Sequence, residues 1–301
     1  MLYGFDVGGT KIAFSVYDQG LNCLLTEQII TPADYSGFKT AILDLVKRAD
    51  QRFACKGLIG IGFPGAISGS EQRVNCANVA AIKGQTLATD LSGVLDREIK
   101  LENDANCFLL SECYGGSADN CRAALAVTLG TGVGGAIFVN GAIQRGLNGF
   151  AGEIGHYPIP ATMLLKYPDL PLFDCGCGRK MCLETYSSGT GLSNLYRYYS
   201  GHHVHSPEII SKYQRGDKMA AKVLDIYLDL LAAGLATAIL VLDPEVIVLG
   251  GGLSKLTLLT EQLIKRLPEH LLKNVLLPQI NAPMFGATGG VRGAALLNYH
   301  P

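Results

Sequence analysis

The sequence predicts an α/β protein of two domains, each built on a related unit. A chain of 301 residues corresponds to about two domains of ordinary size. Short apolar strands alternate with amphipathic helical patterns, as is typical of α/β folds. Segments 5–11 and 127–133 share one pattern, in which a strand, a glycine-rich turn and a second strand follow one another. This internal similarity predicts a duplicated architecture with a cleft between the halves.

Composition narrows the class of protein. Hydrophobic residues make up 48% and charged residues 17%, which excludes a disordered chain, a collagen and a coiled coil. The formal net charge is −1, so we expect no broad electrostatic surface for nucleic acid or anionic membrane. The 37 glycines predict many sharp turns or close approaches of the backbone to a ligand.

The expected environment is a reducing cytoplasm. The start of the sequence has no basic segment followed by an apolar core, so we expect no secretory signal. The longest charge-free apolar stretch, Leu230–Leu242, has thirteen residues, too few to span a bilayer, and is predicted to be a buried helix. The nine cysteines are an odd number, and the six that are scattered singly are expected to be core thiols.

The elements are assigned from periodicity and turn residues. We expect a first domain at residues 1–117, joined by a linker at 115–120 to a second domain at residues 118–289. A last helical pattern at Val291–Leu297 predicts that about 290–301 packs back on the first domain. The predicted strands are Leu2–Val7, Ile12–Tyr17, Cys23–Ile30, Leu58–Phe63, Ile99–Leu101, Ala123–Leu129, Ala136–Val139 and Val246–Leu249. The predicted helices are Ser36–Phe53, Asp104–Tyr114, Lys218–Leu242 and Leu256–Leu272.

The first glycine-rich turn suits a phosphate. Gly8, Gly9, Thr10 and Lys11 offer free backbone N–H groups and a cation at a tight turn. Asp6, at the preceding strand end, could hold Mg²⁺ directly or through water. The alternative is a plain β-hairpin turn with an exposed lysine. The spacing excludes a Walker A loop.

The second glycine-rich turn matches G-x-G-x-x-G at Gly130, Gly132 and Gly135. Because a strand rather than a helix follows, a dinucleotide-binding turn is excluded. The chain also lacks the H-R-D and D-F-G motifs of protein kinases. The turn is therefore expected to face phosphates, while the run 250–252 offers a backbone surface on which a flat adenine could lie.

Two further groups of residues could carry chemistry. Asn103 and Asp104 lie between a strand and a helix, where they could cap the helix, or Asp104 could serve as a general base. Cys175, Cys177 and Cys182 place three thiols in eight residues, a spacing close to that of a structural zinc site. A redox pair or chance spacing is the alternative. The fourth ligand should be a histidine, and the candidates are His156, the nearest upstream, then His202, His203 and His205, expected in a wet surface loop, and His270 and His300.

Together these motifs resemble the ROK family of sugar kinases, over the whole chain and in the family's order. The segments that carry the resemblance are 6–11, 103–106, 130–135, 153–156 and 175–184. The resemblance implies an actin-like, ribonuclease-H-like fold with ATP in a cleft between two domains. It also implies ATP-dependent phosphorylation at the 6-hydroxyl of a sugar, with N-acetylglucosamine favoured over glucose and N-acetylmannosamine, and structural Zn²⁺ besides Mg²⁺.

The resemblance also implies residue roles. Asp104 would take the proton from the sugar 6-hydroxyl. The sugar site would be lined by Gly65, Asn78, Asn103, Asp104, Glu153, His156 and Glu184. The zinc ligands would be His156, Cys175, Cys177 and Cys182. The nucleotide would contact Gly4, Asp6, Gly8, Gly9, Thr10, Lys11, Gly130, Thr131, Gly132, Val133, Gly134, Gly135, Gly250, Gly251 and Gly252.

One position departs from the family, which usually has glycine where Met181 stands. If that position requires a positive φ, Met181 is strained and the thiol loop differs locally. The family also contains sugar-responsive repressors, but these carry an added N-terminal DNA-binding domain, and here the first glycine turn falls within ten residues of Met1. The expected partners are a small sugar and ATP, without nucleic acid or membrane, and the family suggests a homodimer.

Overall fold

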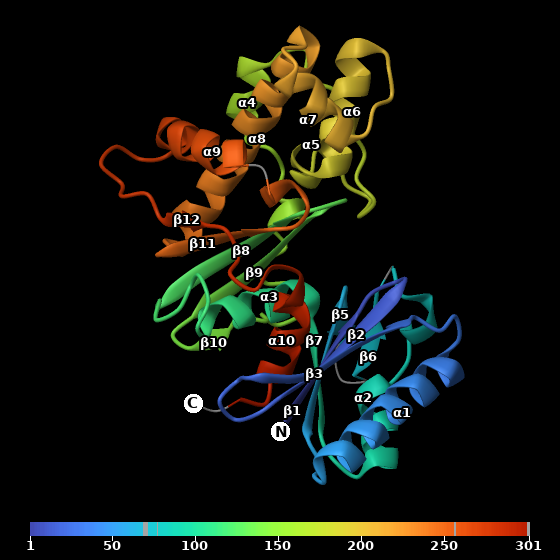
Figure 1. Cartoon of the computed structure of the whole chain (residues 1–301). Helices are drawn as coiled ribbons and strands as arrows, with labels where there is room; N and C mark the ends of the chain where they lie inside the picture. The colour runs from blue at the N-terminus through green and yellow to red at the C-terminus, as the bar shows by residue number, and fades with distance from the viewer. Residues whose placement is uncertain (69–71, 77, 256, 300–301) are drawn as a thin grey trace. The chain divides into compact units, whose positions relative to one another are not determined.

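The computed structural model describes residues 1–68, 72–76, 78–255 and 257–299. Its contacts divide the chain into two compact units (Figure 1). The first unit comprises residues 1–120, 142–151 and 283–301, and the second comprises 121–141 and 152–282. Leu256, the first residue of an expected helix, and His300, a candidate zinc ligand, lie outside the described residues.

The first unit is built on a mixed sheet with the strand order β3-β2-β1-β4-β7. Its strands are β1 (Leu2–Val7), β2 (Lys11–Tyr17), β3 (Cys23–Ile30), β4 (Leu58–Phe63) and β7 (Ile99–Asn103). β1 pairs antiparallel with β2 but parallel with β4, and β4 pairs parallel with β7. The carboxyl ends of β1, β4 and β7 therefore meet at one edge, which is where α/β sheets place ligands.

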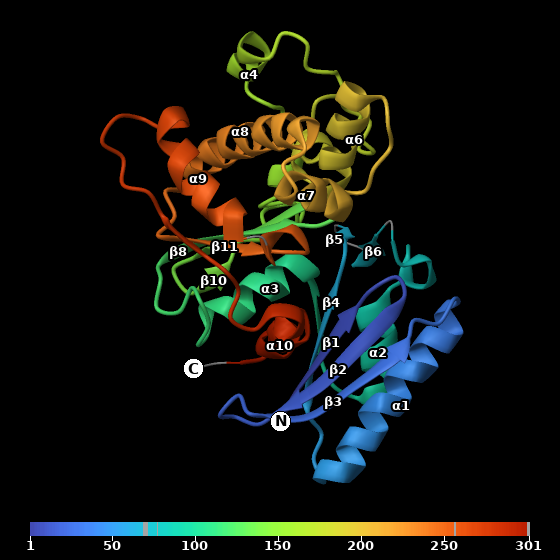
Figure 2. The ribbon, with the colours of Figure 1, turned by 45° about the horizontal axis from the view of Figure 1, so that its top comes forward.

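Helices cover both faces of this sheet. α1 and α2 lie on one face, and α3 and α10 lie on the other (Figures 1 and 2). The helix bounds are α1 (Tyr35–Phe53), α2 (Leu87–Leu95), α3 (Asp104–Cys113) and α10 (Gly289–Leu296). α1 begins at the cap Asp34, whose carboxylate accepts the Gly37 N–H at 2.9 Å. Its apolar face, spaced at three and four residues, is buried as the sequence predicts.

Helix α10 reaches the first unit from the far end of the chain and packs backbone to backbone. A Cβ on Gly4 of β1 would lie 2.0 Å from the Val291 carbonyl oxygen, and one on Gly60 of β4 would lie 1.9 Å from that of Ala294. A Cβ on Gly293 of α10 would lie 1.7 Å from the Cys107 carbonyl oxygen in α3. Any side chain at these positions would therefore push α10 away from the sheet or from α3.

Smaller elements surround the edge of the sheet. A hairpin of β5 (Ala66–Ser68) and β6 (Arg73–Asn75) follows β4, and the short 3-10 helix η1 (Ala80–Ile82) follows the hairpin. Near the carboxyl end of the chain, the 3-10 helix η4 (Gly286–Thr288) precedes α10. Residues 142–151, which include the short strand β10 (Ala142–Ile143), belong to this unit.

The second unit has a sheet in which β9, β8, β11 and β12 are neighbours in that order. The strand bounds are β8 (Ala123–Leu129), β9 (Val133–Val139), β11 (Val246–Gly250) and β12 (Gln279–Asn281). β8 pairs antiparallel with β9, whereas β11 pairs parallel with β8. The turns that follow β8 and β11 are therefore neighbours at one edge.

A long helix, α8 (Lys218–Leu242), organises the core of the second unit. Asp217 caps it by accepting the Ala220 N–H at 2.8 Å. With 25 residues the helix is long and apolar enough to cross a membrane by length and composition, but residues 230–242 lie in a largely buried helix, as the sequence predicts. Since 83% of the most apolar stretch of α8 is buried, it serves as the core helix of this unit.

The remaining helices of the second unit had no counterpart in the sequence analysis except α9. Their bounds are η2 (Ile154–His156), α4 (Ala161–Lys166), α5 (Glu184–Ser187), α6 (Gly189–Ser200), α7 (Ser206–Gln214), η3 (Leu253–Lys255) and α9 (Thr257–His270). Two other expectations need correction. The strand expected at Ala136–Val139 begins at Val133, and Cys23, expected as a core thiol, is exposed. All nine cysteines are free.

We predict that Gly60→Ala destabilises the protein by about 1–3 kcal/mol or more, because the added methyl meets the Ala294 carbonyl at 1.9 Å. Gly93, inside α2, is the control, because a Cβ added there would have nothing within 4 Å. Gly93→Ala should therefore stabilise the protein by about 0.5–1 kcal/mol. Urea unfolding of both variants measures the difference. Equal stability of Gly60→Ala and wild type would contradict the close packing of α10.

Candidate functional site

The first glycine turn lies between β1 and β2 and is closed by the Gly8 N–H, which donates to the Lys11 carbonyl at 2.9 Å. Thr31 braces the turn, since its hydroxyl donates to the Gly8 carbonyl at 2.7 Å. Gly9, Thr10 and Lys11 are exposed. Their backbone and the Lys11 ammonium group are therefore available to an anionic ligand.

Asp6 precedes this turn and is held against the first turn of α10. A Cβ on Gly290 would lie 2.6 Å from the Asp6 Oδ2 atom, so the glycine leaves room for the carboxylate. Burial and the negative charge of Asp104 raise the pKa of Asp6, Lys11 lowers it, and the net result is a pKa of about 6. Burial also raises the pKa of Asp104. Two neighbouring carboxylates with raised pKa values form a site that a divalent cation would stabilise.

Asp104 opens helix α3 directly after β7. Its neighbour Asn103 is the cap, because the Asn103 Oδ1 accepts N–H groups from Ala105 at 2.8 Å and Asn106 at 3.3 Å. Of the two residues that could cap the helix, Asn103 therefore forms the cap. The Asp104 carboxylate accepts backbone N–H groups at the start of α3, among them that of Ala105 at 2.9 Å. These bonds hold the carboxylate at the amino end of the helix.

Gly65 and Asn78, two expected sugar contacts, lie near these groups. The Asn103 Nδ2 donates to the Gly65 carbonyl at 3.0 Å, which ties the strand end to the turn after β4. Gly9 is packed against Asn78, since a Cβ on Gly9 would lie 2.5 Å from the Asn78 carbonyl. The first unit therefore brings together Asp6, the turn 8–11, Gly65, Asn78, Asn103 and Asp104. Gly4 differs, because it is buried beneath α10 and packs against that helix.

In the second unit, the turn 130–135 and the turn after β11 lie side by side. A Cβ on Gly251 would lie 2.4 Å from the Leu129 carbonyl at the end of β8, and Gly251 has φ +85°. The Gly130 N–H donates to the Gly132 carbonyl at 3.0 Å, and Gly130 accepts the Gly189 N–H at 2.7 Å. Two glycine turns thus present main chain at one edge of the sheet.

Glu184 lies between the turn 130–135 and the cysteine cluster. A Cβ on Gly132 would lie 2.7 Å from the Glu184 Oε2 atom, and the Glu184 Oε1 accepts the Cys175 thiol at 3.1 Å. His156 is near both glutamates expected to bind sugar. Its Nδ1 is 3.8 Å from the Glu184 Oε1, and its Nε2 is 3.8 Å from the Glu153 Oε2. The second unit therefore gathers all three side chains.

The predicted metal ligands also converge. The ligand atoms of His156, Cys175, Cys177 and Cys182 all lie within 4.8 Å of one another. The Cys177 and Cys182 sulfurs are 3.6 Å apart, and the Cys175 sulfur is 3.7 Å from the His156 Nδ1. Tetrahedral zinc with Zn–S bonds of about 2.3 Å requires sulfur separations of about 3.8 Å. The donor set and its spacing therefore fit a structural zinc ion.

Met181 has the conformation that raised the question of strain, since its φ is +62°. Its N–H donates to the Phe173 carbonyl at 2.9 Å, and its carbonyl accepts the Ile159 N–H at 3.0 Å. Its side chain also packs against the hydrophobic core of the second unit. These contacts hold Met181 in a backbone conformation that usually favours glycine. The next residue, Cys182, belongs to the cysteine cluster.

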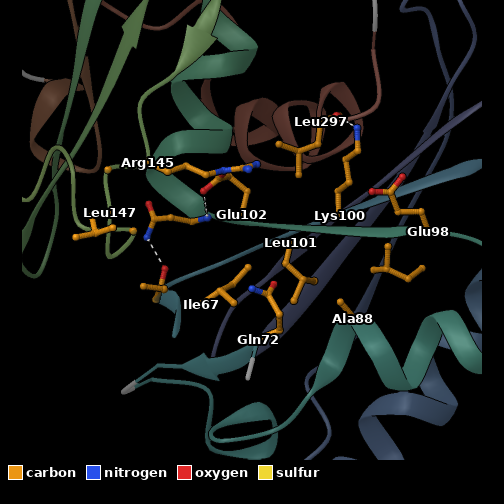
Figure 3. A pocket seen from close by; sticks show the side chains of 16 residues that line it. Ile67, Gln72, Ala88, Glu98, Lys100, Leu101, Glu102, Arg145, Leu147 and Leu297 are labelled. Atoms are coloured by element: carbon orange, nitrogen blue, oxygen red, sulfur yellow. Dashed lines mark hydrogen bonds and ion pairs between the residues drawn. The ribbon is translucent and has the colours of Figure 1, made fainter. Parts of the chain in front are cut away.

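A cavity of about 580 Å³ lies in the first unit, along β7 and beside Asn103 (Figure 3). Its wall includes Arg145 and Glu102, which point toward each other and form an ion pair (Figure 3). The sequence analysis gave neither residue a role. A glutamate directly before the Asn103–Asp104 pair was the available signal, but its partner is 43 residues away.

Comparison with known proteins identifies the family of this chain. The model of the ROK family matches residues 2–300. The chain belongs to the ROK family. An N-acetyl-D-glucosamine kinase of Escherichia coli O139:H28 is 44% identical over 300 residues, which cover 99% of each chain. The resemblance inferred from the motifs is confirmed.

Solved structures of the family share the fold. A ROK hexokinase from Thermus thermophilus aligns with a TM-score of 0.88 at 30% identity, covering 98% of this chain and 96% of that one. A ROK glucokinase from Streptomyces griseus, solved with glucose and AMPPNP, aligns with a TM-score of 0.75 at 28% identity, covering 98% of both chains. The fold is therefore that of the actin-like ATPases, as the sequence predicts.

We predict that Asp6→Asn stabilises the metal-free protein at pH 8 by about 3 kcal/mol, as the rise in the pKa of Asp6 to about 6 implies. A raised folded-state pKa contributes stability at low pH that is lost as the pH rises through 6. The gain should therefore fall to about half at pH 5. Urea unfolding at the two pH values tests this.

Asp18 provides the matched control, because hydrogen bonds from Asn22 lower the pKa of its exposed carboxyl. Asp18→Asn should therefore show no gain at pH 8. A gain for Asp6→Asn that is the same at both pH values would contradict the raised pKa.

Proposed function

We propose that this protein transfers the γ-phosphate of ATP to the 6-hydroxyl of N-acetyl-D-glucosamine. Identity of 44% to an N-acetyl-D-glucosamine kinase over essentially the full length of both chains carries this proposal. The site chemistry supports it, because Asp104 presents a carboxylate of raised pKa at the carboxyl end of β7, next to Asp6. Phosphoryl transfer depends mainly on such positioning and charge stabilisation.

Asp104 is the general base in this proposal. A base works best when its pKa approaches the working pH, and burial shifts the pKa of Asp104 in that direction. The Asn103 cap fixes the start of α3 and so orients the Asp104 carboxylate. When bound with ATP at Asp6, Mg²⁺ would neutralise phosphate charge. The backbone of the turns 8–11, 130–135 and 250–252 would contact the nucleotide.

The sugar contacts follow from the same comparison. In the first unit, Gly65, Asn78 and Asn103 would join Asp104 around the acceptor. In the second unit, Glu153, His156 and Glu184 would bind hydroxyl groups, and their mutual proximity supports a shared ligand. Carboxylates and amides that accept and donate hydrogen bonds are suited to a sugar that offers several hydroxyls.

A structural zinc ion would hold the second set in place. Four protein ligands leave no open coordination position, so the ion would take no part in the chemistry. His156 would bind zinc through Nδ1, the ring atom that faces Cys175, and keep Nε2 for hydrogen bonding. Zinc would thereby fix the segment that carries Glu153 and His156 relative to Glu184.

Glucose or N-acetylmannosamine kinase activity is the alternative within the family. A non-enzymatic regulator is less well supported, because the matched kinase aligns with this chain over 99% of its own length. We also propose a cytoplasmic homodimer that binds neither nucleic acid nor membrane. The near-neutral charge and the burial of α8 support the last two points.

A panel of sugars tests the proposed substrate. With saturating Mg-ATP, N-acetylglucosamine should exceed glucose in kcat/KM by about 10²–10³, because a pocket shaped for an acetamido group adds both packing and a hydrogen bond. N-acetylmannosamine, with its C2 group on the other face, should be poorer still. A higher kcat/KM for glucose or N-acetylmannosamine would reject the substrate but keep the kinase. No turnover of any sugar would reject both.

We predict that Asp104→Asn lowers kcat by about 10²–10⁴, as expected on removal of a general base. Folding should be preserved, because the α3 cap is the unaltered Asn103. Steady-state kinetics and circular dichroism measure the two effects. Turnover like that of wild type would exclude Asp104 as the base.

We predict one zinc ion per chain, measured by elemental analysis of protein purified without a metal-binding tag. Cys177→Ala should lose the ion and lower both stability and activity, because binding free energy contributes to folding. Cys23→Ala, at an exposed thiol of the first unit, should keep zinc and activity. A fully active, zinc-free wild-type protein would contradict the proposal.

A further inference from the structure

The cavity along β7 contains a buried carboxylate to which the proposed mechanism gives no task. Glu102 is only 5% exposed. Its Oε1 accepts the Asn103 N–H at 2.9 Å and the Asn106 Nδ2 at 2.9 Å. Its Oε2 accepts the Arg145 Nε. A buried carboxylate is stable only with such partners, and here they come from two separate segments.

The first segment is the junction of β7 and α3. Asn103 caps the helix and Asn106 lies in its first turn, so both partners flank Asp104. Glu102 orients the Asn106 amide, since only the NH₂ group can donate to a carboxylate. The carboxylate therefore fixes the backbone that carries the proposed base.

The second segment is the loop 145–151, which ends two residues before Glu153. The loop is closed by the Ala151 N–H, which donates to the Arg145 carbonyl at 3.2 Å. Gly146 and Gly149 have φ +71° and +73°, as sharp turns require. A Cβ on Gly149 would lie 3.5 Å from the Ala66 Cβ, so the loop reaches the β5 hairpin on the opposite wall of the cavity.

Little apolar burial holds this loop. Leu147 is 98% exposed and Phe150 is 55% exposed. The Arg145 side chain is 59% exposed, whereas the side chain of its partner Glu102 is only 6% exposed. The ion pair is therefore anchored at its buried end, the Glu102 carboxylate. A pair of this kind is worth more than an ordinary surface salt bridge, and it is well placed to decide whether the loop stays on the cavity.

We infer that Glu102 and Arg145 form a latch that fastens the loop 145–151 over the acceptor side of the site and so sets the affinity for the sugar. The inference rests on the proposed function, because Gly65 and Asn103, proposed sugar contacts, line the same cavity. Both residues are positioning residues. Loss of the Arg145 side chain leaves the bonds of Glu102 to Asn103 and Asn106 in place, and with them Asp104 and the nucleotide turns, so it should act on the KM for sugar.

Arg145→Gln tests the latch, since it removes the charge and the Nε donor but keeps a polar side chain. The KM for N-acetylglucosamine should rise at least tenfold, while kcat changes less than threefold and the KM for ATP stays constant. Arg48→Gln is the control, because Arg48 pairs with Glu27 at 2.7 Å on the surface of the same unit. It should alter none of these constants.

A double-mutant cycle with Glu102→Gln supplies the second measurement. If the pair acts as one latch, the double variant should have a KM for sugar no higher than that of the weaker-binding single variant. Effects on KM that simply multiply, or an Arg145→Gln effect confined to kcat, would overturn the inference.

Limited digestion with chymotrypsin gives a readout that does not depend on turnover. Leu147 and Phe150 are exposed cleavage sites within the loop. Arg145→Gln should be cut there at least fivefold faster than wild type and Arg48→Gln. Equal cleavage rates would overturn the latch, whatever the sugar panel shows. Faster cleavage of Arg145→Gln in a protein without sugar kinase activity would reject the proposed function and the effect on sugar affinity, but not the latch itself.

Discussion

The close approach of α10 to the first sheet is the constraint on which the rest of this unit depends. Gly4 and Gly60 let the helix lie directly on β1 and β4, and Gly293 lets it lie directly on α3. The same helix carries Gly290, whose missing side chain makes room for the Asp6 carboxylate. Residues more than 280 positions apart therefore form one surface, and the position of Asp6 depends on packing that any side chain would disrupt.

That packing places an unfavourable electrostatic pair at the strand ends. Asp6 and Asp104 are both largely desolvated, which raises the pKa of each, and the charge of Asp104 further opposes the ionisation of Asp6. Lys11 offsets only part of the effect. Such a pair lowers stability in the absence of a cation, which is expected where a site is shaped for a charged ligand rather than for its own stability.

The sequence was most informative where a pattern is local. Cys23–Ile30 and Leu58–Phe63 were predicted with their observed bounds, because apolar runs between turn residues determine strands. The cysteine spacing likewise predicted a cluster that the structure brings together. The helices between residues 184 and 214 were not predicted, because α5 is short, α6 mixes Ser193 into its buried face, and α7 buries Ile209 alone. The Glu102–Arg145 pair depends on folding and has no periodic signal.

Helix α3 shows how the local and the distant contacts combine. At its amino end, Asn103 caps the helix and Glu102 joins it to the loop 145–151. At its carboxyl end, the fully buried Glu112 accepts N–H groups from Met284 at 2.9 Å and Phe285 at 3.0 Å. A helix fixed at both ends by buried carboxylates has little freedom to shift along its axis. Since a general base must be held within a fraction of an ångström, the bonds of Glu102 to Asn103 and Asn106, with those of Glu112 to the segment before α10, serve the residue that begins the helix, Asp104.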